Sequence, residues 1–162
     1  MNQEELKILI YGYGNPGRQD DGLGPIVADL IEKENFSNVK IDSNYQLNAE
    51  DAVALADSDI TVFVDASEDE KVETFNFFEV KPDDEIGYTT HAMSAGSVLA
   101  LCNTVYKKHP ATYMLGIRGV EWGFKEELSQ RGRQNLELAV SFLKDLLKNP
   151  SKERFQKALK PK

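Results

Sequence analysis

Two nearly continuous apolar runs constrain the fold of this chain more than any other feature of its sequence. They occupy residues 6–12 and 60–65, and they end at Gly12 and Asp65. Apolar runs of this length, without alternation, are typical of strands that are buried on both faces of a sheet. Such strands need a layer of helices on each side, and crossover helices usually connect them. The runs therefore predict an α/β fold.

Shorter segments complete an alternating pattern of strands and helices. Further strands are predicted at residues 39–41, 74–80 and 112–117, and helices at residues 23–34, 48–55, 94–106 and 129–147. The helices are recognised by apolar residues three or four positions apart. Asn48 and Ser94 are suitable N-caps for two of them. We expect a three-layer α/β domain with a mostly parallel, twisted sheet of about five strands and helices on both faces.

Length and charge divide the chain into a body and a tail. A single α/β domain is predicted over residues 1–148 of the 162, followed by a basic tail at 149–162 that forms either a short helix or a disordered segment. The net charge is −8. From Lys148 onward there are six basic residues and one acid, which leaves 13 basic and 26 acidic residues in the rest of the chain. This excess of acid argues against binding to nucleic acid through its phosphates.

Cysteine content and hydropathy indicate the compartment. Cys102 is the only cysteine, so no internal disulfide can form, and its place on an apolar helix face predicts a small core residue. No apolar run approaches the roughly 20 residues of a membrane span. The polar, acidic first residues do not resemble a secretory signal. We expect a cytoplasmic monomer that does not bind membranes.

The loop after the first apolar run carries a glycine pattern that is also used for nucleotides. Gly12-x-Gly14-x-x-Gly17 matches G-x-G-x-x-G, and Asp42 follows about 25 residues later, near the usual place of a ribose-binding acid. A dinucleotide- or flavin-binding module is therefore one alternative. However, two adjacent acids at positions 20 and 21 lie where a pyrophosphate would have to bind, and their charge repels it.

Three side chains with metal-binding chemistry are expected at the carboxyl edge of the sheet. Asp21 precedes the first helix, Asp65 ends the second apolar run, and His91 precedes a later helix. Ligands of open parallel sheets bind beyond the carboxyl ends of the strands. Two carboxylates and one imidazole suit nickel, zinc or iron and leave coordination positions open. Simpler interpretations are a helix cap for Asp21, a turn residue for Asp65 and a structural or exposed histidine for His91.

The glycine loop also matches a longer and more specific pattern. Residues 12–24 resemble the G-x-G-N-x-x-x-x-D-[DE]-G-x-G opening of the [NiFe]-hydrogenase maturation proteases. Later blocks of that family have similar counterparts in the same order: residues 62–66, which end in Asp-Ala, then Thr90 and His91, then an E-W-G segment at 121–123 with Leu-Ser at 128–129. The resemblance covers about residues 6–147 and excludes the basic tail.

This resemblance implies a hydrolase, a metal-dependent cytoplasmic endopeptidase that removes the C-terminal extension of a hydrogenase large-subunit precursor after nickel loading. It implies that the precursor supplies the nickel, that no organic cofactor is needed, and that Asp21, Asp65 and His91 are both the metal-contacting and the catalytic residues. Asn15 and Asp20 are expected to support them. The metal, or water polarised by it or by a carboxylate, would assist attack on a nearby peptide bond. A non-catalytic chaperone that checks metal loading is the remaining alternative.

Overall fold

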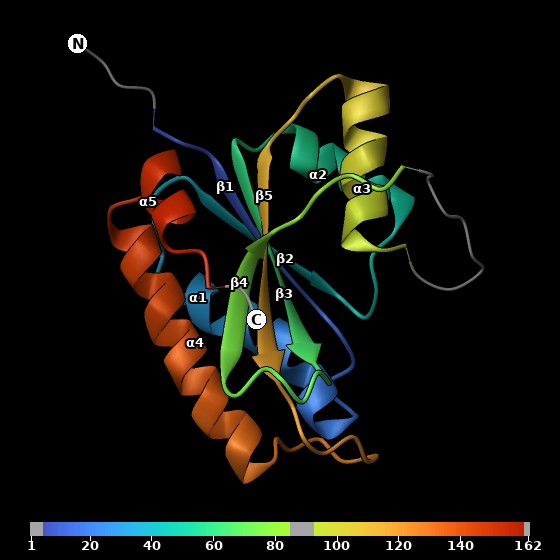
Figure 1. Cartoon of the computed structure of the whole chain (residues 1–162), viewed down its shortest axis with the longest axis vertical. Helices are drawn as coiled ribbons and strands as arrows, with labels where there is room; N and C mark the ends of the chain where they lie inside the picture. Colours follow the sequence, from blue (N-terminus) through green and yellow to red (C-terminus); the bar gives the residue numbers. More distant parts are fainter. Residues whose placement is uncertain (1–4, 85–92, 161–162) are drawn as a thin grey trace.

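Figure 1 shows the computed structural model of the chain, which describes residues 5–84 and 93–160. These residues form one five-stranded sheet with the strand order β2-β1-β3-β5-β4. The strands are β1 (Ile8–Tyr13), β2 (Val39–Asn44), β3 (Ile60–Ser67), β4 (Phe75–Glu79) and β5 (Ala111–Arg118). All neighbouring pairs are parallel except β4 and β5, which pair antiparallel at one edge. The predicted α/β fold with a mostly parallel sheet is confirmed.

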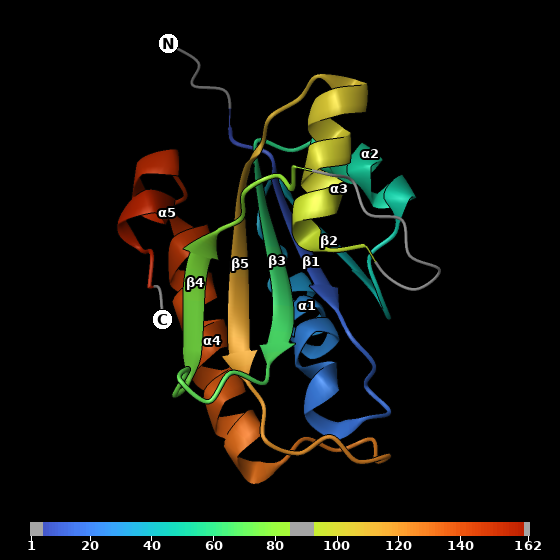
Figure 2. The same cartoon turned by 45° about the vertical axis from the view of Figure 1, so that its right-hand side comes forward.

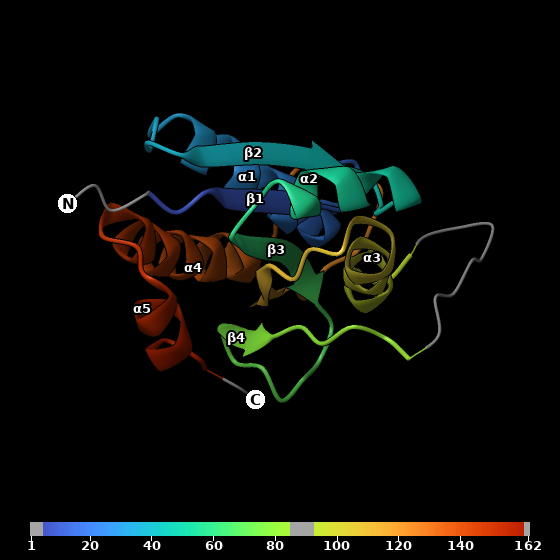
Figure 3. The same cartoon turned by 90° about the horizontal axis from the view of Figure 1, so that it is seen from above.

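Helices cover both faces of this sheet. Helices α4 (Gln130–Lys148) and α5 (Lys152–Lys157) lie on one face, and α2 (Ala52–Ala56) and α3 (Ala95–Leu101) lie on the other (Figure 3). Helix α1 (Leu23–Glu32) packs on the same face as α4. Within the described part of the chain, no helix combines the length and the apolar composition needed to cross a membrane.

Strand β1 shows why a continuous apolar run was the right signal. Ile8 and Ile10 pack into the core under α1 and α4, whereas Leu9 and Tyr11 pack into the core under α2 and α3. Successive side chains of a strand point to opposite faces, so a central strand must be apolar at every position. The predicted site residues consequently lie at the carboxyl ends of β1 and β3, two strands whose first five residues are all buried.

Two predicted helix starts are also seen. Ser94 caps α3 by accepting a hydrogen bond from the main-chain N–H of Ser97 at 3.0 Å. Ser129 caps α4 in the same way, accepting from Gly132 at 2.9 Å. The predicted helix at 94–106 is α-helical only as far as Leu101, and the turn Cys102–Tyr106 is a π-helix. Cys102 is fully buried, as its position on the apolar face predicted.

The basic tail forms α5 and joins the core through one aromatic residue. Phe155 is fully buried, with ring centroids 5.6 Å from Tyr113 and 6.3 Å from Phe77. Beyond α5, Lys160 exchanges two main-chain hydrogen bonds with Phe77 on strand β4, at 2.7 and 2.8 Å. Phe155 is therefore the fully buried residue of a mostly polar and basic segment, which the pairing of Lys160 with β4 also holds in place.

Phe155→Leu is expected to lower the free energy of unfolding by about 1–2 kcal/mol. Leucine keeps the position apolar but loses the ring contacts and leaves part of the volume unfilled. Urea unfolding measures the change, with Lys157→Ala as the control, because Lys157 is exposed and its ion pair with Glu153 contributes little. Equal stability of the two variants would contradict a core role for α5.

Candidate active site

The glycines of the first loop allow β1, β3 and α1 to approach each other closely. A Cβ atom on Gly24 would clash with the carbonyl oxygens of Val64 and Tyr13. Gly14 has a φ of +139°, and a Cβ there would clash with the carbonyl oxygen of Asp21. Only glycine meets both requirements without strain. The glycine pattern therefore has a packing role, which brings the start of α1 to the ends of β1 and β3.

The main-chain N–H groups of this loop already have acceptors within the protein. The N–H of Gly14 donates to the carbonyl of Asn44 at 3.1 Å, and that of Gly17 donates to Asn15 Oδ1 at 2.9 Å. The N–H groups of residues 18–21 donate to main-chain carbonyls. A bound pyrophosphate depends on such donors. The loop therefore does not favour the dinucleotide- or flavin-binding alternative.

Asp21 is held within this loop by the main chain of Asn15. Its Oδ2 atom accepts the Asn15 N–H at 2.9 Å. The N-cap position of α1 is Gly22, so Asp21 lies one residue too early to cap the helix. The side-chain oxygen of Asn15 is used within the loop, because it accepts the N–H of Gly17. Asn15 therefore supports Asp21 through its main-chain N–H group.

Asp65 lies in β3, beyond the last residue of the strand that is fully buried. Its Oδ1 atom accepts the N–H of Ala66 at 2.8 Å. Burial raises the pKa of Asp65 to about 7, and the charges of Asp21 and Glu68 raise it as well, while hydrogen bonds from Ala66 and Tyr13 lower it. Burial likewise raises the pKa of the Tyr13 hydroxyl, and the charge of Asp65 adds to this effect. The charge of Asp21 therefore acts on Asp65, and a buried acid with a raised pKa such as Asp65 is typical of functional sites.

Asp20, by contrast, is fully buried among hydrogen-bond donors. Its two oxygens accept the N–H groups of Val120, Glu121 and Ser129 at 2.8, 3.0 and 2.9 Å, and the Ser129 hydroxyl at 2.7 Å. Burial alone raises the pKa of this carboxyl, but the hydrogen bonds outweigh it and hold the pKa below its usual value. Asp20 thus ties the glycine loop to the segment that leads into α4.

His91 lies outside the described residues. The residues that flank its segment are fixed: Asp83 Oδ2 accepts hydrogen bonds from the hydroxyls of Ser94 and Ser97, at 2.6 and 2.9 Å. Within residues 5–84 and 93–160, no three side chains of His, Cys, Asp or Glu group together as a metal site. The three-residue set of Asp21, Asp65 and His91 therefore stays a prediction, with its two acids placed at one edge of the sheet.

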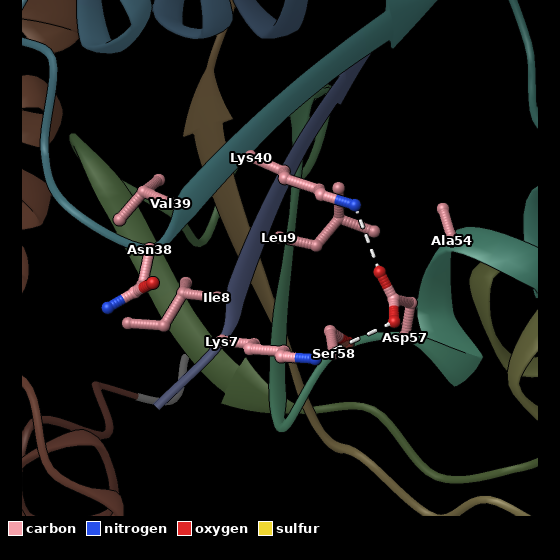
Figure 4. A pocket seen from close by; sticks show the side chains of 9 residues that line it. All are labelled: Lys7, Ile8, Leu9, Asn38, Val39, Lys40, Ala54, Asp57 and Ser58. Atoms are coloured by element: carbon pink, nitrogen blue, oxygen red, sulfur yellow. Dashed lines mark hydrogen bonds and ion pairs between the residues drawn. The ribbon is translucent and has the colours of Figure 1, made fainter. Parts of the chain in front are cut away.

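Two pockets lie at opposite ends of the sheet. One, of about 370 Å³, is lined by Asp65 together with Asn76 and Gly116. The other, of about 200 Å³, lies at the amino ends of β1 and β2, where Lys40 and Asp57 form an exposed ion pair of 2.9 Å (Figure 4). Ligands of open α/β sheets bind at the carboxyl ends of the strands. The pocket beside Asp65 lies at this edge and is lined by one of the predicted site acids, so it is the candidate active site.

Comparison with known proteins identifies the fold. No protein-family model and no curated protein sequence matches the chain. Among solved structures, the [NiFe] hydrogenase maturation protease HycI from Thermococcus kodakarensis KOD1 is 24% identical with a TM-score of 0.71, over 89% of this chain and 94% of that one. The chain has the fold of the hydrogenase maturation proteases. The maturating endopeptidase HybD from E. coli has a TM-score of 0.69 at 18% identity, over 90% of this chain and 94% of its own.

The maturation-protease fold also places residues that the sequence did not single out. Tyr13 lies beside Asp65 and lowers its pKa, and Asn76 faces the same pocket from β4. Asn76 interrupts an apolar strand segment, with Phe75 before it and Phe77 after it. This polar residue within an apolar strand could have identified Asn76 as a candidate, because a buried polar side chain needs a hydrogen-bond partner.

Proposed function

We propose that this chain is an endopeptidase that removes the C-terminal extension of a nickel-loaded large-subunit precursor of a [NiFe] hydrogenase. One observation carries the proposal: at the carboxyl edge of a sheet with the maturation-protease fold, burial raises the pKa of Asp65 to about 7, and the charge of Asp21 adds to this effect. Two acids that influence each other at a ligand-binding edge suit contact with a cation. In this proposal the protein acts as a monomer in the cytoplasm.

Asp21, Asp65 and His91 would contact the nickel of the precursor. Carboxylate oxygens and an imidazole nitrogen are ligands that Ni²⁺ accepts. The N–H groups of Asn15 and Ala66 hold one oxygen of Asp21 and one of Asp65, so both carboxylates are oriented before the substrate arrives. The remaining carboxylate oxygens are the ones proposed to meet the metal.

Cleavage in this proposal uses water. The nickel of the precursor polarises the scissile carbonyl or the attacking water. A carboxylate oxygen of Asp65 that is not bound to the nickel would accept the proton of that water as general base. Cys102 does not compete as a nucleophile, because it is fully buried and burial raises the pKa of its thiol.

The experiment that tests the function compares nickel-loaded with nickel-free precursor. The purified chain is incubated with each, and intact-mass spectrometry follows the loss of the C-terminal peptide. We expect cleavage of the nickel-loaded form only, because the nickel-free form lacks the contacts with Asp21, Asp65 and His91 that favour the cleavable state. An intact nickel-loaded precursor would contradict the proposal.

Binding experiments with the purified chain distinguish the proposed endopeptidase from a chaperone and from a nucleotide-binding module. Stable binding of the nickel-loaded precursor without release of a peptide would instead indicate a chaperone that checks metal loading. A rise in melting temperature with NAD, NADP, FAD or FMN, and none with Ni²⁺ or Zn²⁺, would favour the nucleotide-binding module, since a ligand stabilises the state that it binds.

A further inference from the structure

Asp65, Gly116 and Asn76 form one row across three neighbouring strands. Asp65 pairs with Gly116 between β3 and β5, and Gly116 pairs with Asn76 between β5 and β4. These strands lie side by side in Figure 2, with α2 and α3 toward the other end of the same face. Directly paired residues project from the same face of a sheet. Asp65 and Asn76 therefore stand on either side of a position that has no side chain.

The missing side chain creates the pocket. The space of about 370 Å³ beside Asp65 is lined by Gly116 and Asn76, and by Met114 and Phe78 from the next row that faces the same way. A Cβ atom on Gly116 would clash with Asn76 Oδ1. Glycine at this position therefore lets the Asn76 carboxamide lie over β5, on the side of Asp65.

The Asn76 carboxamide is the unusual feature of this pocket. The residue is only 4% exposed, and its Oδ1 atom is buried with no hydrogen-bond partner in the part of the chain that the structure describes. Nearly all buried polar atoms in native proteins have a partner, and those that do not often have a binding or catalytic role. Asn76 also lines the pocket, so a rotation of its carboxamide toward the pocket would present this acceptor to a ligand that brings a donor.

We propose that Asn76 binds the main chain of the precursor, holding it as an extended segment across Gly116 and beside Asp65. A carboxamide offers one acceptor and two donors, which match the N–H and C=O groups of a peptide unit. Once the Asn76 carboxamide turns toward the peptide, the absence of a Cβ on Gly116 leaves room for a backbone to lie close to the sheet. The row then places this peptide unit next to Asp65. The inference rests on the proposed function for the identity of the peptide.

The test uses the full chain and a synthetic peptide that spans the processing site of the same precursor. Asn76→Ala is compared with Asn103→Ala. Asn103 is a matched control, because its Oδ1 atom is also buried without a partner among the described residues, but it lies in Cys102–Tyr106, on the path from α3 to the amino end of β5. NMR follows the ¹H–¹⁵N signals of the side-chain amides, assigned by their loss in each variant.

We expect the Asn76 amide signals to shift on addition of the peptide, and those of Asn103 to stay unchanged. Asn76→Ala should raise the Kd for the peptide at least tenfold, and Asn103→Ala should leave it unchanged. The melting temperature of Asn76→Ala should change little, because the Oδ1 atom has no hydrogen-bond partner among the described residues and the substitution removes only the packing of the carboxamide.

The inference would be overturned if the wild-type chain did not bind the peptide at millimolar concentration. The same Kd for wild type and Asn76→Ala would also overturn it. So would a lowered melting temperature of Asn76→Ala together with unshifted Asn76 signals in the wild type. Failure of the proposed function looks different, because the wild-type chain would then leave the nickel-loaded precursor uncut whatever the variants bind.

Discussion

Asp65→Asn is expected to abolish processing of the precursor while making the protein more stable at neutral pH. Asparagine keeps the size of the side chain, but it cannot accept a proton from water and offers nickel no negative charge. Loss of a general base typically lowers a rate by about 10²–10⁴-fold. Intact-mass spectrometry of the precursor over time measures the rate.

The gain in stability follows from the raised pKa of Asp65. The group ionises near pH 3.8 in the unfolded chain and near pH 7 in the folded one. Between these values the folded state binds the extra proton, so the contribution of Asp65 to the free energy of unfolding falls as the pH rises from about 4 to about 7. Asparagine does not ionise, so the Asp65→Asn variant does not lose this free energy of unfolding as the pH rises. Discounted for partial exposure, we expect Asp65→Asn to be about 2 kcal/mol more stable than wild type at pH 7.5 and nearly equal to it at pH 4.

Urea unfolding at the two pH values measures this difference. If Asp65→Asn differed from wild type by the same free energy of unfolding at both pH values, a raised pKa of Asp65 would be contradicted. For activity, Asp57→Asn is the matched control, because Asp57 is an exposed acid at the opposite end of the sheet. Asp21→Ala and His91→Ala should lose processing as well and still unfold cooperatively. Full activity in all three site variants would refute the site assignment.

The central sheet was predictable because a strand that is buried on both faces is apolar at nearly every position of its local sequence. Every residue of β1 from Ile8 to Gly12 is buried, so the strand needs no knowledge of distant residues to be recognised. The direction of β4 was not predictable in this way. An edge strand has the same pattern whether it runs parallel or antiparallel, and the pairing of Phe77 with Leu115 decides the direction only in the folded chain.

The placement of Asp21 and Asp65 at the carboxyl edge of the sheet was predictable, but the surroundings of these acids were not. Adjacent acids such as Asp20 and Asp21 have the same chemistry, and their sequence neighbours do not say which one is buried. The distinction comes from Val120 and Ser129, which lie 100 and 109 residues away from Asp20. The Asn76 oxygen that has no partner among the described residues likewise depends on Gly116, the glycine paired with Asn76 on the neighbouring strand β5. Such long-range contacts leave no periodic signal in a single sequence.

Asp20→Ala is expected to lower the free energy of unfolding by about 4 kcal/mol, enough to reduce the melting temperature by about 10 °C. The substitution leaves three main-chain N–H groups and one hydroxyl buried without their acceptor. It also leaves a void, because Gly119 and Gly132 lie so close to Asp20 that a Cβ on either would clash with its side chain. Thermal and urea unfolding give the two quantities.

Two companion variants separate the charge of Asp20 from its size. Asp20→Asn preserves the volume but turns an NH₂ group toward donors that need acceptors, so it should lose nearly as much stability as alanine. Asp29→Ala removes an exposed acid from α1 and should change stability by less than about 0.5 kcal/mol. Because hydrogen bonds lower the pKa of Asp20, its stabilising contribution is present above about pH 4 and is lost as the pH falls through its folded pKa. The deficit of Asp20→Ala should therefore shrink in acid, whereas a deficit caused by lost volume alone would persist.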